Sequence, residues 1–258
     1  MRFKSNSTVG PPGLPVRIRT ALLASPIIGP LLAKIFYHPL SREVLHEYWR
    51  RPSDGVNLPE NYAGPKERSA FLVRIVSRYA KPDARILEIG CNVGRNLEYL
   101  FRVGFREGLT GIEISEEAVA LMKETFPEMA ANARIYNSPA EDIVETLEDQ
   151  SFDLVFTMAV LEHIHTSSEW LFHEIVRITR QYLVTIEDER GYNGRHFPRN
   201  YREIFEALGL HQLEEISCKE VEGLGKTFTA RIFTRSTGPT ALDGSQSDRT
   251  NAATGLDV

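Results

Sequence analysis

Short apolar segments alternate with helical patterns along most of this chain, and the alternation limits the possible folds more than any other feature. Candidate strands cover residues 85–89, 109–113, 133–136, 152–157 and 182–186, and candidate helices cover residues 65–79, 96–103, 116–125, 168–178 and 201–208, with a short helix from Glu141. Repeated strand–helix units predict a parallel sheet covered on both faces, with ligands at the carboxyl ends of the strands. Residues 212–221 and 227–233 have hairpin spacing, which predicts an antiparallel edge strand. We therefore predict a doubly wound α/β fold with a mostly parallel sheet of seven strands.

Composition excludes several other classes of protein. The chain has 258 residues, of which 42% are hydrophobic and 25% are charged, as in an ordinary globular protein. Two cysteines, Cys91 and Cys218, cannot form a disulfide framework, so we expect a reducing, cytoplasmic compartment. A net charge of −5 argues against nucleic acid as a partner.

Charge divides the chain unevenly. The first 51 residues carry eight basic and two acidic side chains, so they have a net charge of +6 and the remainder has −11. We expect a flexible arm over residues 1–15, a basic and apolar helical extension over 16–64, the main domain over 65–235 and a disordered tail over 236–258. Residues 16–40 are interrupted by Pro26, Gly29, Pro30 and Lys34, which argues against a membrane span. Two interpretations stay open for them: a peripheral membrane anchor, or a cap on this domain or on a second subunit.

A glycine-containing turn between the first strand and its helix carries the chemistry. The strand holds Glu88, and Gly90 and Gly94 follow in the turn, where a missing Cβ lets a ligand approach the main chain. The three-glycine spacing of dinucleotide-binding proteins is absent. An acid at this point would repel a diphosphate and attract an ammonium or sulfonium group.

This turn resembles the first motif of the class I S-adenosylmethionine-dependent methyltransferases, of the small-molecule type 11 and type 12 families. That motif is an acid followed by three alternating glycines, and the match here is Glu88-Ile89-Gly90-Cys91-Asn92-Val93-Gly94, with Asn92 in place of the middle glycine. Asparagine tolerates the left-handed backbone conformation better than most residues. The resemblance implies a Rossmann-like fold and S-adenosylmethionine as the cofactor.

Three later segments match further motifs of that family. By resemblance, Glu113 accepts hydrogen bonds from the ribose hydroxyls, Ile114 and the Ala140-Glu141 segment contact adenine, and Met158 supports the methionine part. The implied cofactor-binding set is Glu88, Gly90, Cys91, Asn92, Gly94, Glu113, Ile114, Ala140, Glu141 and Met158.

Glu162 and His163, after the fourth strand, are the catalytic candidates. Leu161-Glu162-His163 resembles the Leu-Glu-His of the ubiquinone-biosynthesis O-methyltransferases, which implies His163 as the general base. A packing role for His163 is the alternative. Some members of that subgroup use a metal with an additional acid two residues earlier, but this chain has Ala159 there, so no metal site is assigned.

The loop after the fifth strand supplies the acceptor-binding candidates Glu187, Tyr192 and His196. We expect a small-molecule or glycan-type acceptor, methylated on oxygen rather than nitrogen. The Asn/Asp-Pro-Pro-aromatic motif of nucleic-acid amino-methyltransferases is absent after the fourth strand. Two other functions stay open: a non-catalytic S-adenosylmethionine-binding module at a membrane assembly, and a nicotinamide-dependent oxidoreductase.

Overall fold

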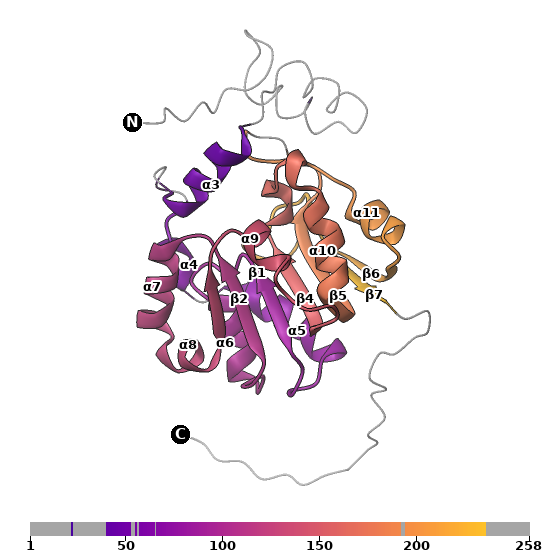
Figure 1. Cartoon of the computed structure of the whole chain (residues 1–258). Coiled ribbons are helices and arrows are strands. Elements are labelled where there is room, and N and C mark those ends of the chain that lie inside the picture. Colours follow the sequence, from indigo (N-terminus) through magenta and orange to yellow (C-terminus); the bar gives the residue numbers. More distant parts are fainter. Residues whose placement is uncertain are drawn as a thin grey trace, which may run out of the picture.

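The sheet has seven strands in the order β3-β2-β1-β4-β5-β7-β6 (Figure 1). A computed structural model describes residue 22 and residues 40–235, except 53, 54, 56, 65, 192 and 193. The strands are β1 (Ile86–Ile89), β2 (Leu109–Glu113), β3 (Arg134–Asn137), β4 (Phe152–Met158), β5 (Thr179–Asp188), β6 (His211–Ser217) and β7 (Phe228–Thr234). The predicted doubly wound α/β architecture is confirmed.

Parallel pairing joins the first five strands. β1 pairs with both β2 and β4, so it lies at the centre of the parallel part and its carboxyl end opens between two neighbours. β7 pairs antiparallel with β5 on one side and with β6 on the other. The predicted antiparallel strand is therefore β7, which lies one place inside the edge strand β6.

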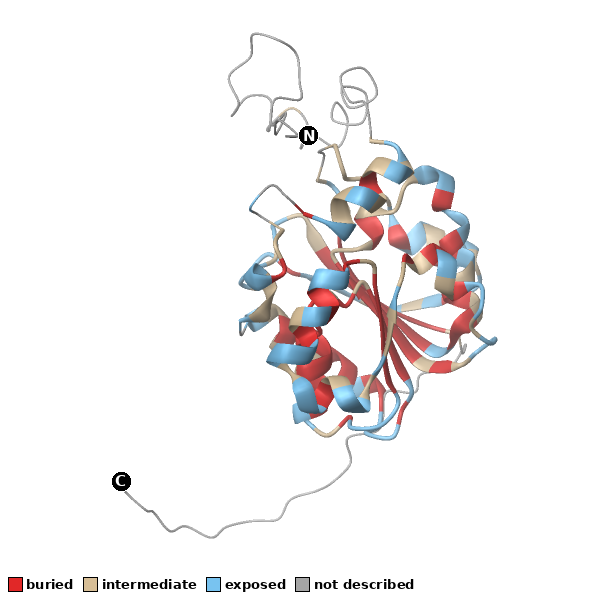
Figure 2. Cartoon of the chain, turned by 60° about the vertical axis from the view of Figure 1, so that its left-hand side comes forward, coloured by how far each residue is buried: buried red, intermediate tan, exposed pale blue. Residues whose placement is uncertain are grey.

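Helices cover both faces of the sheet. The helices are α3 (Arg42–Arg50), α4 (Glu60–Ala63), α5 (Glu67–Tyr79), α6 (Arg95–Arg102), α7 (Glu116–Thr125), α8 (Pro127–Asn132), α9 (Ala140–Val144), α10 (Trp170–Ile178) and α11 (Tyr201–Ala207), with 3-10 turns at Leu161–His163 and Thr166–Ser168. Residues of α5 to α8 pack in one hydrophobic core and residues of α9 to α11 in another. Figure 2 shows the buried residues along the strands between these layers.

Alternation along the strands explains the two cores. Ile86 of β1 contributes to the core with α5 and α6, and Leu87 contributes to the core with α10, because successive side chains point to opposite faces. Leu154 and Val155 of β4 divide in the same way. Both faces are buried, which is why most residues of these strands are apolar.

The N-terminal region contributes a helix above the carboxyl ends of the strands. α3 begins after Ser41, whose side chain accepts a hydrogen bond from the backbone N–H of Val44. Figure 1 shows α3 apart from the two helical layers and above the sheet. The predicted arm, most of the 16–40 segment and the predicted tail lie outside the described residues. No helix in the described part of the chain has the length and hydropathy to cross a bilayer.

Candidate cofactor and acceptor site

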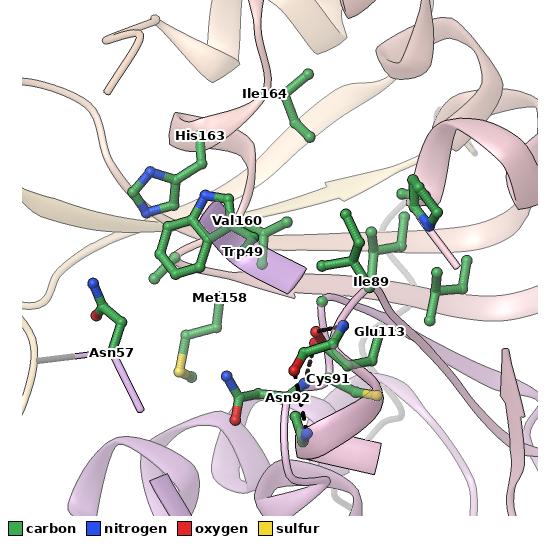
Figure 3. A pocket seen from close by; sticks show the side chains of 18 of the residues that line it. Trp49, Asn57, Ile89, Cys91, Asn92, Glu113, Met158, Val160, His163 and Ile164 are labelled. Atoms are coloured by element: carbon green, nitrogen blue, oxygen red, sulfur yellow. Dashed lines mark hydrogen bonds between the residues drawn. The ribbon is translucent and has the colours of Figure 1, made fainter. Parts of the chain in front are cut away.

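A cavity of about 430 Å³ lies at the carboxyl ends of the parallel strands, beneath α3. Residues that follow β1, β2, β3 and β4 line it from below, and residues of α3 and the segment after it line it from above. Figure 3 shows Glu113, Cys91 and Asn92 at one end of this pocket and Trp49 and His163 at the other. The volume suits a small organic ligand.

The turn after β1 forms the floor of the pocket. Gly90 and Asn92 have positive φ angles of 74° and 49°, so the predicted left-handed conformation of Asn92 is present. A Cβ on Gly90 would lie 2.4 Å from a methyl carbon of Val160. Any larger residue at Gly90 would therefore displace the loop after β4, which lines the same pocket.

Gly94 has a different role from the one expected. It does not line the pocket, and a Cβ there would lie 2.8 Å from side-chain atoms of Met122 and Met129. Its φ of 69° begins α6 in the left-handed conformation. The prediction that Gly94 admits a ligand is corrected, because the space that its missing side chain leaves is filled by α7 and α8.

Glu113 ends β2 with its carboxylate at the pocket. The two oxygens accept hydrogen bonds from the backbone N–H groups of Asn92 and Ser115, both at 2.7 Å. Each oxygen keeps a second lone pair for another donor. Burial raises the pKa of Glu113 to about 7. The side chain is thus fixed in orientation and can accept hydrogen bonds from a bound diol.

Glu88 belongs to a buried polar chain. Its Oε1 accepts a hydrogen bond from Asn96 at 2.7 Å, and Asn96 in turn accepts one from Ser69. Arg95 donates to the same Ser69 hydroxyl and to the backbone carbonyl of Tyr62. The Oε2 atom of Glu88 is buried without a hydrogen-bond partner among the described residues. Burial raises the pKa of Glu88 to about 8.

Glu141 connects the sheet to α3. It lies at the start of α9 and its Oε1 is 3.1 Å from Nε2 of His46. Burial acts to raise the pKa of Glu141, but hydrogen bonds from His46 and from its own backbone outweigh this and lower it. Glu141 therefore lines the pocket as a carboxylate that also holds the helix above it.

The remaining predicted cofactor residues all line the pocket: Cys91, Ile114, Ala140 and Met158. Cys91 and Met158 are buried, and Met158 lies beside the amide of Asn96. These residues give the cavity apolar walls between Glu113 at one end and His163 at the other.

His163 is packed between two rings. Its centroid lies 4.6 Å from those of Trp49 and His196. Its Nδ1 lies 2.8 Å from the carbonyl of Arg195, so Nδ1 carries the proton and Nε2 has a free lone pair. Burial lowers the pKa of His163 to about 3, so the ring is neutral at physiological pH. Both His163 and His196 line the pocket.

Glu187 does not face the acceptor, contrary to expectation. Its side chain is fully buried and absent from the pocket lining. Oε1 accepts a hydrogen bond from Thr157 at 2.6 Å, and Oε2 accepts from the backbone N–H groups of Val160 and Leu161. Strand β5 continues to Asp188, so Glu187 still lies within the strand. Its side chain is buried against a face of the sheet and does not reach the pocket. It holds the turn that carries Glu162 and His163.

Glu162 is also buried, at 2% exposure, and lines the pocket. Its Oε2 accepts a hydrogen bond from the backbone N–H of Asp188. Burial and the neighbouring Glu187 raise the pKa of Glu162.

Tyr192, the third acceptor candidate, lies outside the described residues.

Several pocket residues were missed by reasoning from the sequence. His46 and Trp49 come from α3, far from the glycine turn in sequence, and no local pattern indicates where that helix docks. Arg95 and Asn96 directly follow the turn, so their place at the start of α6 was a signal that could have been used.

Comparisons with known proteins agree with this geometry. Residues 87–182 match the model of a methyltransferase domain family. Residues 87–182 thus belong to a methyltransferase domain, and the fold around them is that of the class I S-adenosylmethionine-dependent methyltransferases. No curated protein matches the chain significantly in sequence. The family match supports S-adenosylmethionine as the cofactor, which residues of the pocket described above would hold.

Solved structures share the fold of this methyltransferase domain at low identity. Magnesium protoporphyrin IX methyltransferase from Synechocystis PCC 6803, with bound SAH, is 14% identical with a TM-score of 0.61, covering 76% of this chain and 100% of that one. A TehB-like methyltransferase from Corynebacterium glutamicum is 22% identical with a TM-score of 0.51, over 69% and 98%. The [4+2]-cyclase SpnF is 16% identical with a TM-score of 0.55, over 78% and 98%. Since one of these proteins is a cyclase, the fold alone does not define the reaction.

The residues present fit this cofactor. The unpartnered Oε2 of Glu88 is a buried acceptor beside the glycine turn, which suits the ammonium group of a methionine moiety. Glu113 lies across the turn with lone pairs for a ribose diol.

Proposed function

We propose that this methyltransferase domain transfers a methyl group from S-adenosylmethionine to an oxygen of a small-molecule or glycan-type acceptor. The observation that carries the proposal is one continuous pocket with two chemically different ends. Buried carboxyl groups, Glu88 and Glu113, lie at one end, and a cluster of Trp49, His163 and His196 lies at the other. The first end suits a cationic, diol-bearing cofactor, and the second suits an acceptor held against rings.

The cofactor supplies an activated methyl group on a sulfonium, so the protein's task is to align the acceptor and to exclude water. Trp49 and His163 present ring faces and edges on which an aromatic ring or a sugar can pack. The covering helix α3 brings Trp49 there and separates the pocket from solvent on that side.

In this proposal His163 takes the acceptor's proton. Its Nε2 lone pair is free because Nδ1–H is hydrogen-bonded to the Arg195 carbonyl. Glu162 Oε1 lies 3.7 Å from Nε2 of the same ring. Glu187 acts as a positioning residue, because it fixes the backbone of the turn that carries both side chains.

Turnover of the His163→Ala variant tests this role. Acceptor candidates are incubated with methyl-labelled S-adenosylmethionine, and labelled product and S-adenosylhomocysteine are measured. Loss of a general base lowers kcat by about 100-fold or more, while affinity for S-adenosylhomocysteine stays within about twofold, since that ligand's site lies at the other end.

His173→Ala is the matched control, because His173 lies exposed on α10 away from the pocket. The control retains wild-type turnover. Full turnover by His163→Ala would remove His163 from the reaction, and labelled product with methyl on nitrogen would refute the assignment of an oxygen acceptor.

A further inference from the structure

Three potential metal ligands meet at the acceptor end of the pocket. One ligand atom each from Glu162, His163 and His196 lies within 4.8 Å of the other two. Glu162 and His163 come from the turn after β4, and His196 comes from the loop after β5. We propose that Glu162, His163 and His196 bind a divalent transition-metal ion.

The hydrogen bonds around this cluster orient its ligand atoms. Nδ1–H of His163 is hydrogen-bonded to the carbonyl of Arg195, at 2.8 Å, which leaves Nε2 as the donor to a metal. Histidine ligands of metals are usually fixed by such a bond from the other ring nitrogen. Oε2 of Glu162 accepts from the backbone N–H of Asp188, and Oε1 is 3.7 Å from Nε2 of His163. One oxygen and one nitrogen thus face the same point.

His196 adds a ligand from a separate segment. Its ring packs edge-on against His163, with centroids 4.6 Å apart. Its Nδ1 is buried and has no hydrogen-bond partner among the described residues. His196 thus offers a buried, unsatisfied nitrogen as a third ligand, next to Glu162 and His163. A site built from these three residues does not need an acid in place of Ala159.

Two buried carboxyl groups beside the cluster also favour a cation. Glu162 is 2% exposed, and Glu187, which holds the same turn, is fully buried. No lysine or arginine in the described ranges forms an ion pair with either carboxyl group. A buried carboxylate is costly without a positive partner, and a divalent ion would provide it.

The set of ligands indicates the kind of metal. Two imidazoles with one carboxylate are typical of zinc sites that keep an open position, and of open iron(II) sites. Magnesium and calcium prefer oxygen ligands throughout. The open positions would face the pocket, where an acceptor hydroxyl can bind and release its proton to water. That step rests on the proposed function but changes the role of His163: with a metal bound, Nε2 is a ligand and water takes the acceptor's proton, while the new C–O bond forms as the C–S bond breaks.

Cobalt(II) is a suitable probe, because its visible absorption reports the ligand geometry directly. The full-length protein, stripped with a chelator, is titrated with Co²⁺ alone and then with Zn²⁺ as competitor. We expect one equivalent of Co²⁺ with an absorption band typical of nitrogen and oxygen ligands, which Zn²⁺ abolishes. His196→Ala and Glu162→Gln should each weaken Co²⁺ binding by about 10-fold or more.

Controls separate this proposal from the proposed function. His165→Ala removes a neighbouring histidine that lines the pocket outside the cluster, and it should bind Co²⁺ as the wild type does. His196→Ala should retain affinity for S-adenosylhomocysteine, which shows that the variant is folded. Failure of the wild type to bind Co²⁺ while it binds S-adenosylhomocysteine would overturn the metal site and leave the methyltransferase proposal intact. Equal loss in His165→Ala would also overturn it.

Discussion

Glu88 and Glu113 are acids that the fold keeps out of water at the place where a cationic ligand is proposed to bind. Burial raises the pKa of Glu88 to about 8 and that of Glu113 to about 7. The ordinary pKa of a glutamate side chain is 4.5. Between pH 4.5 and the raised pKa values, the folded, ligand-free protein therefore holds more protons than the unfolded chain. The stabilisation gained from that proton uptake is lost as pH rises through the folded pKa values.

Affinity for the cofactor product should therefore depend on pH. Between about pH 6 and about pH 8.5, thermal stability of the ligand-free protein falls as Glu113 and Glu88 lose protons. Affinity for S-adenosylhomocysteine rises over the same range, because the ionised carboxylates are the forms that accept its hydrogen bonds. Calorimetric titrations at three pH values, with melting curves at each, measure both trends. Affinity that is constant or decreases with pH would contradict the assignment of these two acids.

Single residues also show where sequence motifs were misleading. Gly94 and Glu187 were expected to contact ligands, yet Gly94 packs against two methionines and Glu187 binds the backbone of the turn after β4. A motif gives the position along the chain but not the direction of a side chain. Direction depends on where β5 ends and on how α7 and α8 pack, and neither is local information.

Individual elements were predicted best where local signals were strongest. Strand β2 and helix α7 have the predicted bounds, because a buried apolar run and the capping Ser115 delimit them. Helix α8 was missed, although Pro127 at its first position is a residue that often begins a helix. The docking of α3 over the pocket depends on contacts between distant residues, which no periodicity reveals.

Helix α3 is the element whose role can be tested most simply. His46 connects it to Glu141 in the pocket, with 3.1 Å between Nε2 and Oε1. His46→Ala should weaken S-adenosylhomocysteine binding by about three- to tenfold, as expected for the loss of one hydrogen bond. The effect should appear mainly as faster dissociation, measured by surface plasmon resonance.

Arg50→Ala is the control for α3, because Arg50 lies exposed at the end of the same helix. It should leave the dissociation rate unchanged. Equal rates in the wild type and in His46→Ala would show that α3 does not retain the ligand.

In the whole molecule, the pocket is formed by the carboxyl ends of the parallel strands together with a helix from the N-terminal region. The parallel strands place their carboxyl ends together, and this places the residues after β1, β2, β3 and β4 around one cavity. The first 51 residues have a net positive charge, which suits the position of α3 above an acidic pocket. There His46 of α3 contacts Glu141. The structure thus supports a capping role for residues 42–50, while residues 23–39 lie outside the described ranges.

A calorimetric titration with S-adenosylhomocysteine tests the central claim most directly. The wild type should bind one equivalent and should not bind NADH. Glu113→Gln should bind about 10- to 100-fold more weakly, because a charged acceptor of two hydrogen bonds is lost. Glu124→Gln, an exposed acid on α7, is the control and should bind as the wild type does. Binding of NADH in preference to S-adenosylhomocysteine, or unchanged affinity in Glu113→Gln, would contradict this account.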